Sequence, residues 1–161
     1  MRLLFMAVFA LASLASCTSD KAPTGFESPS ATIDSLFRAY GVQDMTQDEA
    51  RRRLQARERF ELLDPVLFRS CFSDWQGEHD QALGGFVFGQ LVAAKKDMQI
   101  EVHGDTARVQ VAPASPELEP IVLVKQDFAW KIDLRQSVPP QIRQSLYEVY
   151  RRARRAERRA Q

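Results

Sequence analysis

Apolar residues in the first half of the chain recur at helical spacing. A first helix is expected between a Ser30 cap and a Gly41 stop. Its apolar face comprises Ile33, Leu36, Phe37 and Tyr40. A Thr46-x-x-Glu49 capping box predicts a second helix that runs to about Leu63. The third predicted helix has the apolar stripe Leu67, Phe68, Cys71, Phe72 and Trp75.

The pattern changes to alternation after Gly84-Gly85, and this predicts strands from the short run Phe86-Val87-Phe88 onward. Residues 98–102 and 107–111 alternate on either side of a His103-Gly104-Asp105 turn, as in a β-hairpin. A loop with Pro113, Pro116 and Pro120 leads to a strand at 121–124. After a turn at 125–127, a final strand is expected with Phe128, Trp130, Ile132 and Leu134 facing the core.

A last helix is predicted from about Pro139-Pro140. Its apolar stripe would comprise Ile142, Leu146, Val149 and Tyr150. Beyond Tyr150 the apolar residues are only Ala153, Ala156 and Ala160, which bury little area. The end of this helix is therefore expected to lie in solvent.

Helices followed by antiparallel strands favour an α+β fold. Gly104-Asp105-Thr106-Ala107-Arg108-Val109 and Trp130-Lys131-Ile132-Asp133 resemble strand motifs of the nuclear transport factor 2-like superfamily, over about residues 30–135. The resemblance implies N-terminal helices packed on a curled, cone-like antiparallel sheet. The Arg-rich C-terminal helix after residue 138 is not a standard part of that cone.

The N-terminus has the pattern of a secretory leader. Arg2 precedes an apolar and small-residue run from Leu3 to Ser16, which is shorter than the roughly 20 residues a membrane-spanning helix needs. Leu14-Ala15-Ser16-Cys17 resembles the lipobox of bacterial lipoprotein precursors. The resemblance implies cleavage before Cys17 and attachment of a diacylglyceryl group there, with palmitate as an expected acyl chain.

Four segments follow from these patterns. They are a signal peptide at 1–16, a lipidated cysteine and Pro/Ser/Thr-rich tether at 17–29, an α+β domain at 30–138 and a basic helix at 139–161. By the sorting rules of the lipoprotein family, Thr18 after Cys17 favours the periplasmic side of the outer membrane in a Gram-negative source. The membrane itself is then the first expected partner.

Charge is concentrated at the end of the chain. From Ile142 onward, seven arginines face two glutamates, a balance of +5. The candidate contacts for an anionic surface are Arg151, Arg152, Arg154, Arg155, Arg158 and Arg159. Three interpretations are open: a solvated helix end, contact with anionic headgroups or another envelope polyanion, and nucleic-acid binding. Nucleic acid is not an expected partner of an exported lipoprotein.

No catalytic arrangement is evident. The two histidines, His79 and His103, lack the spacing of metal ligands, and the acidic group Asp74, Glu78 and Asp80 is typical of a solvated helix face. With Cys17 lipidated, Cys71 would be a lone thiol, either a buried core residue or a redox group. The sequence indicates no cofactor.

Four aromatic residues have two interpretations. Trp75, Phe86, Phe88 and Trp130 would either line a pocket for an apolar ligand or belong to the core. The hypothesis from sequence is a membrane-anchored envelope lipoprotein with a non-catalytic binding or structural domain. The alternative is a small-ligand carrier or enzyme that uses the interior of the cone.

Overall fold

The computed structural model describes residues 23–111 and 119–160. These ranges hold six α-helices, one short 3-10 helix and one four-stranded antiparallel sheet, an α+β fold as predicted. The helices are α1 (Pro29–Ala39), α2 (Gln47–Gln55), α3 (Pro65–Ser70), η1 (Glu78–Asp80), α4 (Gln81–Ala94), α5 (Leu134–Ser137) and α6 (Pro140–Ala160). The strands are β1 (Gln99–His103), β2 (Thr106–Gln110), β3 (Ile121–Gln126) and β4 (Ala129–Ile132). The expected leader, Cys17, Pro113 and Pro116 lie outside the described residues.

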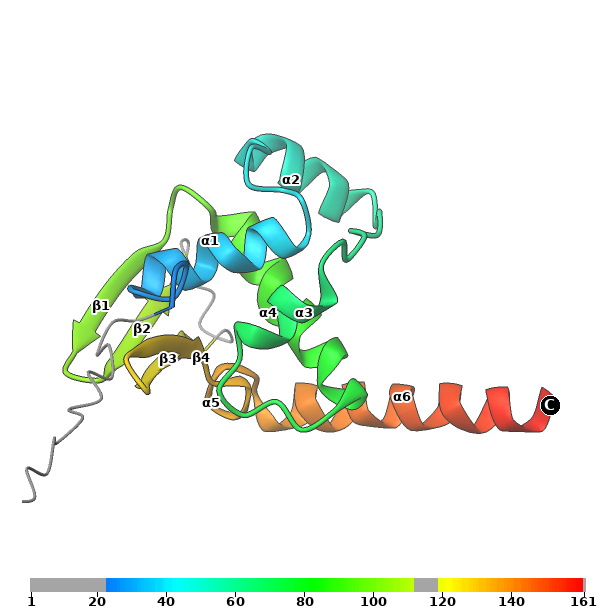
Figure 1. Cartoon of the computed structure of the whole chain (residues 1–161). Coiled ribbons are helices and arrows are strands. Elements are labelled where there is room, and N and C mark those ends of the chain that lie inside the picture. Colours follow the sequence, from blue (N-terminus) through cyan, green and yellow to red (C-terminus); the bar gives the residue numbers. More distant parts are fainter. Residues whose placement is uncertain (1–22, 112–118, 161) are drawn as a thin grey trace, which may run out of the picture.

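The sheet is a meander in the order β1-β2-β3-β4 and lies at one end of the molecule (Figure 1). The predicted hairpin is confirmed, because Ile100 pairs with Val109 and Val102 with Ala107. The sheet is open and not strongly curled, which differs from the expected cone. Its strands are four to six residues long, and twist accumulates little over so few residues and strands.

The turn between β3 and β4 differs from the sequence prediction. Asp127 and Phe128 have φ of 50° and 65°, the left-handed conformation of a tight hairpin turn. Phe128 is therefore 51% exposed at the tip instead of facing the core. Leu134 begins α5 instead of ending a strand, because the Asp133 carboxylate caps that helix by accepting a hydrogen bond from the N–H of Gln136.

The first two helices begin close to where the sequence predicts. Ser28 rather than Ser30 caps α1, while the Thr46 hydroxyl accepts a hydrogen bond from the N–H of Glu49 at the start of α2, as expected. Helix α2 ends at Gln55, not near Leu63. The N–H of Leu63 instead bonds the carbonyl of Ala39 at the end of α1, so the segment follows that tertiary contact.

The third helix is also shorter than predicted. It ends at Ser70, and Phe72 forms a parallel bridge with Ile132 at the edge of β4. The carbonyl of Cys71 accepts a 2.8 Å hydrogen bond from Ile132 N–H, and that of Ile132 accepts a 3.0 Å bond from Ser73 N–H. Pairing with the sheet therefore competes successfully with continued helix.

The prediction of strand at Phe86-Val87-Phe88 is wrong, because these residues lie in α4. Helix α4 is apolar around much of its circumference, as a buried helix is, so its sequence lacks a clear helical period. Gly84 allows it to approach α3 closely. A Cβ there would lie 2.4 Å from Cζ of Phe68.

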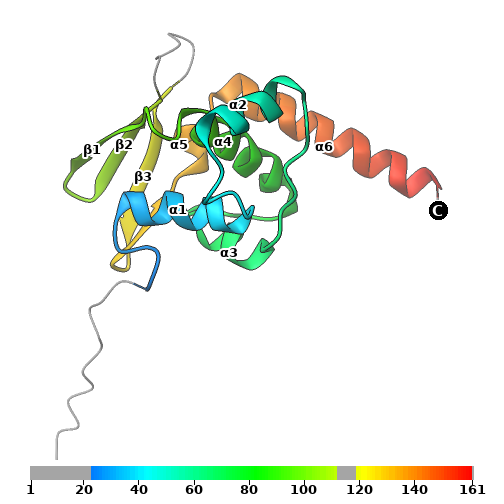
Figure 2. The same cartoon turned by 90° about the horizontal axis from the view of Figure 1, so that it is seen from above.

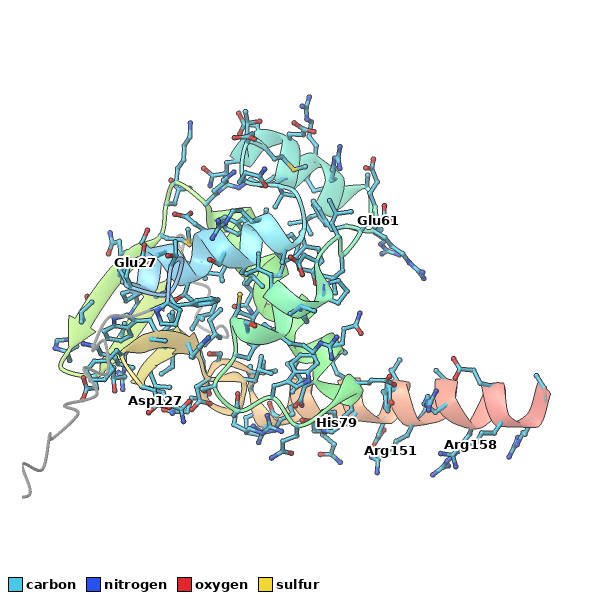
Figure 3. The ribbon with its side chains drawn as sticks, viewed as in Figure 1. Glu27, Glu61, His79, Asp127, Arg151 and Arg158 are labelled. Carbon is cyan, nitrogen blue, oxygen red and sulfur yellow. The ribbon has the colours of Figure 1, made fainter. Side chains whose placement is uncertain are left out.

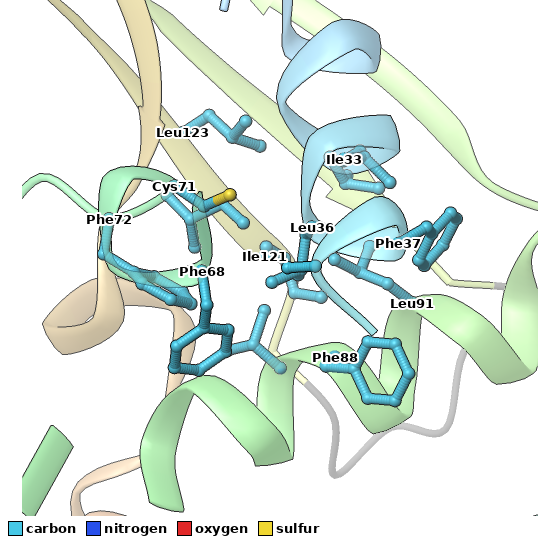
Figure 4. Packing of buried hydrophobic residues seen from close by; sticks show 14 of the residues in the cluster. Ile33, Leu36, Phe37, Phe68, Cys71, Phe72, Phe88, Leu91, Ile121 and Leu123 are labelled. Carbon is cyan, nitrogen blue, oxygen red and sulfur yellow. The ribbon is translucent and has the colours of Figure 1, made fainter. Parts of the chain in front are cut away.

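The core lies between the helices and one face of the sheet (Figure 4). Ile33, Leu36 and Phe37 of α1 meet Leu91 of α4 and Leu123 of β3. An aromatic cluster fills the space beside them, and Tyr40 stacks on Phe88 at 3.8 Å between ring centroids. The remaining members of that cluster are Phe37, Phe60, Phe68, Phe72 and Trp75.

Helix α6 runs along one edge of the molecule and extends well beyond it (Figures 1 and 2). Its 21 residues correspond to about 31 Å of helix. The predicted stripe is only partly correct. Leu146 packs against the core, but Ile142 and Val149 are 38% and 63% exposed. Tyr147, which the prediction omitted, packs there instead.

Candidate functional site along helix α6

The first turns of α6 are held by a cluster of polar side chains, here called the polar junction. It joins η1, α5 and α6 and comprises Asp74, His79, Asp80, Arg135 and Tyr147. Two of its members that share a hydrogen bond, Asp80 and Tyr147, are 67 positions apart in the sequence. No local pattern could therefore have revealed it.

Asp80 is the centre of the polar junction, and its side chain is fully buried. One carboxylate oxygen, Oδ2, accepts a 2.7 Å hydrogen bond from the N–H of Gln76. The other, Oδ1, accepts a 2.9 Å bond from the Tyr147 hydroxyl and lies 3.4 Å from Nη2 of Arg135. Partial burial and then this hydrogen bond raise the pKa of Tyr147 above its ordinary value.

Arg135 links the second carboxylate to the same cluster. Its Nη1 donates a 2.9 Å hydrogen bond to Oδ2 of Asp74, whose oxygens also accept bonds from the N–H groups of Leu134 and Arg135. Both acidic groups are thus satisfied by an arginine and by backbone donors. This arrangement stabilises the α5–α6 connection and leaves neither carboxylate available as a general base.

His79 lies at the surface of the junction. Its Nε2 is 3.6 Å from Oδ1 of Asp80, and 37% of its side chain is exposed. The ring packs edge-on against Tyr147 with centroids 5.2 Å apart. Across residues 23–111 and 119–160, no three His, Cys, Asp or Glu side chains are grouped so that they could hold a metal ion.

Beyond the junction, residues 151–160 form what is here called the arm. All ten residues are exposed, and the helix continues without a break to Ala160. Six are arginines and one, Glu157, is acidic, which gives the arm a formal charge of +5. The prediction of a solvent-bathed helix end is confirmed.

The arginines of the arm gather on one side. At 100° per residue, the six lie within an arc of about 160°, whereas Ala153, Ala156 and Ala160 lie on the opposite side. Figure 3 shows Arg151 and Arg158 directed to the same side, away from the body of the domain. Only Arg152 and Arg154 approach a glutamate, at 3.8 Å from Glu148 and 3.3 Å from Glu157.

A shallow groove lies where the arm leaves the domain. His79, Tyr147, Tyr150 and Arg151 line a volume of about 370 Å³. Further along, the arginine side chains themselves border two more open grooves of about 340 and 310 Å³. The side chains that line these three grooves are therefore mainly arginines and aromatic residues.

The four aromatic residues proposed for a pocket lie in different surroundings. Phe88 and Trp130 are core residues, 3% and 6% exposed, and Phe86 is partly buried against the core. Trp75 borders a groove of about 250 Å³ together with Leu62, Pro65 and Phe68. At least two of the four thus contribute to packing.

Cys71 is fully buried. Burial raises the pKa of its thiol to about 12. Its Sγ donates a 3.3 Å hydrogen bond to the carbonyl of Leu67. This environment agrees with the interpretation of Cys71 as a core residue, since a redox thiol needs access and a low pKa.

Within the residues that the structure describes, no helix has the length and hydrophobicity to cross a membrane. Neither a protein-family model, nor a curated protein, nor a solved structure matches the chain. Function must therefore be argued from the site itself.

Proposed function

We propose that this protein is a lipid-anchored cell-envelope lipoprotein whose domain is a non-catalytic binding module and whose arm holds an anionic partner. The arm carries this proposal. Six arginines lie on one side of this exposed helix, and within the described residues only Arg152 and Arg154 of the arm form ion pairs. The polar junction supports the role because it fixes the direction in which the arm leaves the domain.

The anchoring half of the proposal rests on the lipobox-like Leu14-Ala15-Ser16-Cys17. Anchoring at Cys17 would place the domain on the periplasmic face of the outer membrane in a Gram-negative cell. Kinship with the nuclear transport factor 2-like superfamily also remains a proposal. It is supported by the placement of the two motifs in one sheet, with Thr106–Gln110 as β2 and Ala129–Ile132 as β4 on either side of β3.

The alternative, a ligand carrier or enzyme that uses the domain interior, has less support. The space between α1, α4 and the sheet is occupied by core side chains, among them Leu36, Leu91 and Leu123, each fully buried. The buried carboxylate of Asp80 is directed at Tyr147 and Arg135 rather than at a cavity. The open groove at Trp75 is the feature that best favours this alternative.

The binding role can be tested with immobilised polyglutamate as an acidic probe. The chain from residue 17 onward, with Cys17→Ser, is compared with the same chain lacking residues 151–161. The intact arm should retain the protein at low salt and release it as the salt concentration rises, because its contacts are screened over about 8 Å at physiological ionic strength. Equal retention of both proteins would contradict the proposal.

A further inference from the structure

The side of the arm that carries the arginines is separate from its apolar side. Ala153, Ala156 and Ala160 continue the spacing of Ile142, Leu146 and Val149, so the apolar residues follow one seam along α6. The arginines centre on the face opposite that seam. A helical partner packed on the seam would meet at most the arginines that flank it, whereas a flat surface can meet the arginine face along its whole length.

The arginine face is also free to make contacts. Within the described residues, Arg151, Arg155 and Arg158 form no ion pair, and all three are exposed. They occur at positions i, i+4 and i+7 of one continuous helix, so they lie in a row on one side. Four residues span about 6 Å of helix, so neighbouring charges of this row lie within a Debye length of each other.

The location of the arm allows it to meet the anchoring membrane. The first described residues lie near α1 and the sheet, at the end of the molecule remote from the tip of α6, in both views (Figures 1 and 2). A lipid at Cys17 would therefore hold one end of the domain. If the axis of α6 lies along the membrane, the arginine face can reach the same surface from the other end.

We infer that the arginine face of α6 binds the phosphates of net-anionic headgroups in the membrane to which the lipid on Cys17 attaches, and thereby fixes the orientation of the domain. This inference rests on the proposed function and names its anionic partner. The guanidinium group suits phosphate because it presents several N–H donors in a planar fork. Tethering by the lipid makes the second contact intramolecular, so modest affinity is sufficient.

The first experiment measures binding of the Cys17→Ser chain, residues 17–161, to vesicles of phosphatidylglycerol and phosphatidylethanolamine by co-sedimentation. The test variant replaces Arg151, Arg155 and Arg158 by glutamine. Each basic residue near such a surface contributes about fivefold to affinity, so binding should fall about a hundredfold. Vesicles of neutral phosphatidylcholine should bind neither protein.

A matched control removes the same charge elsewhere. Arg52, Arg57 and Arg59 are exposed residues in or after α2, remote from the arm, and glutamine at these three positions also lowers the net charge by three. This variant should lose less than about threefold in affinity, because distant charges are screened. Equal losses in the two variants would show that total charge, not the arginine face, governs binding, and would overturn the inference.

A second measurement, retention on immobilised polyglutamate, distinguishes the lipid inference from the proposed binding function. Retention of the wild-type chain on polyglutamate without binding to anionic vesicles would overturn the lipid inference and favour an acidic protein, while the proposed binding function stands. Failure of both probes would overturn both. Circular dichroism of each variant confirms that α6 is intact, so a loss of binding is not a loss of helix.

Discussion

Asp80 offers the sharpest test of how α6 is held to the domain. Asp80→Ala would remove two hydrogen bonds, from Gln76 N–H at 2.7 Å and from the Tyr147 hydroxyl at 2.9 Å. It would also remove a 3.4 Å contact with Arg135. Hydrogen bonds to a charged group contribute about 1.5–3 kcal/mol each.

Two hydrogen bonds, each at the lower end of that range, give the expected total. Gln76 is exposed, so water can replace its lost acceptor, and Arg135 retains its 2.9 Å hydrogen bond to Asp74. We therefore expect Asp80→Ala to lower the free energy of unfolding by about 3 kcal/mol and the Tm by about 10 °C. Tyr147→Phe removes only one of these bonds and should lower the free energy of unfolding by about 1.5 kcal/mol.

Urea unfolding followed by circular dichroism measures these changes. Glu78→Ala is the matched control, because it removes a neighbouring exposed carboxylate and should change stability by less than about 0.5 kcal/mol. The double variant of Asp80 and Tyr147 should be less destabilised than the sum of the two single variants by about 1 kcal/mol, since the same hydrogen bond is lost in both. An Asp80→Ala protein as stable as the Glu78→Ala control would refute the role of the polar junction.

The remaining predictions concern packing, the arm and the anchor. Gly84→Ala should destabilise the protein by about 1–3 kcal/mol, because its Cβ would lie 2.4 Å from Phe68. Gly85→Ala, whose Cβ would come no closer than 3.8 Å to the Tyr40 hydroxyl, should be neutral or stabilising by up to about 1 kcal/mol. Thermal unfolding compares the two variants. Deletion of residues 151–161 should leave the Tm within about 2 °C, and a larger decrease measured by calorimetry would mean that the arm is packed. Cys71 should react with a thiol reagent only on unfolding. Because burial raises its thiol pKa from 9.0 to about 12, the stability that it confers is complete below pH 9 and is lost as the pH rises toward 12. Cys71→Ala should therefore flatten the alkaline part of a stability-versus-pH curve. Cys17→Ser should release the protein from the membrane fraction or leave an uncleaved precursor, and unchanged fractionation would contradict lipidation.

The elements that the sequence predicts correctly are those with local causes. The hairpin between β1 and β2 follows from alternation around Gly104, whose φ of 60° suits a glycine turn. The start of α2 follows from the Thr46 cap, and the exposure of the arm follows from its lack of bulky apolar residues. Each of these features is decided within about ten residues of chain.

The errors arise where distant contacts override local preference. Phe86-Val87-Phe88 has strand-like composition, but α4 is helical because a nearly all-apolar helix can bury both sides between α1, α2 and α6. Residues 71–73 leave the helical pattern because Ile132 offers backbone partners. A single sequence contains no signal for either contact.

The candidate site could also be predicted only in part. The six arginines of the arm are visible in the sequence, but the orientation of α6 is not, because it depends on Tyr147 reaching Asp80. The stripe predicted to dock included Val149, which is 63% exposed in the structure. An apolar stripe identifies the side of a helix that can pack. Contacts with the rest of the domain decide which residues of that side are buried.

The polar junction also connects the fold with the proposed function. The arginines of α6 repel one another, and the helix buries little apolar surface. Its first turns therefore need a stabilising contact in addition to hydrophobic packing. Helix α6 has no fully buried residue, and a buried carboxylate at its root supplies a directed contact in place of a large hydrophobic one. A positive arm held at a defined angle can present all its arginines to one surface, whereas a loosely attached arm would lose part of the binding free energy in ordering itself. The position of Asp80 beneath Tyr147 is therefore a reason to regard the arm as a binding element and not as a disordered basic tail.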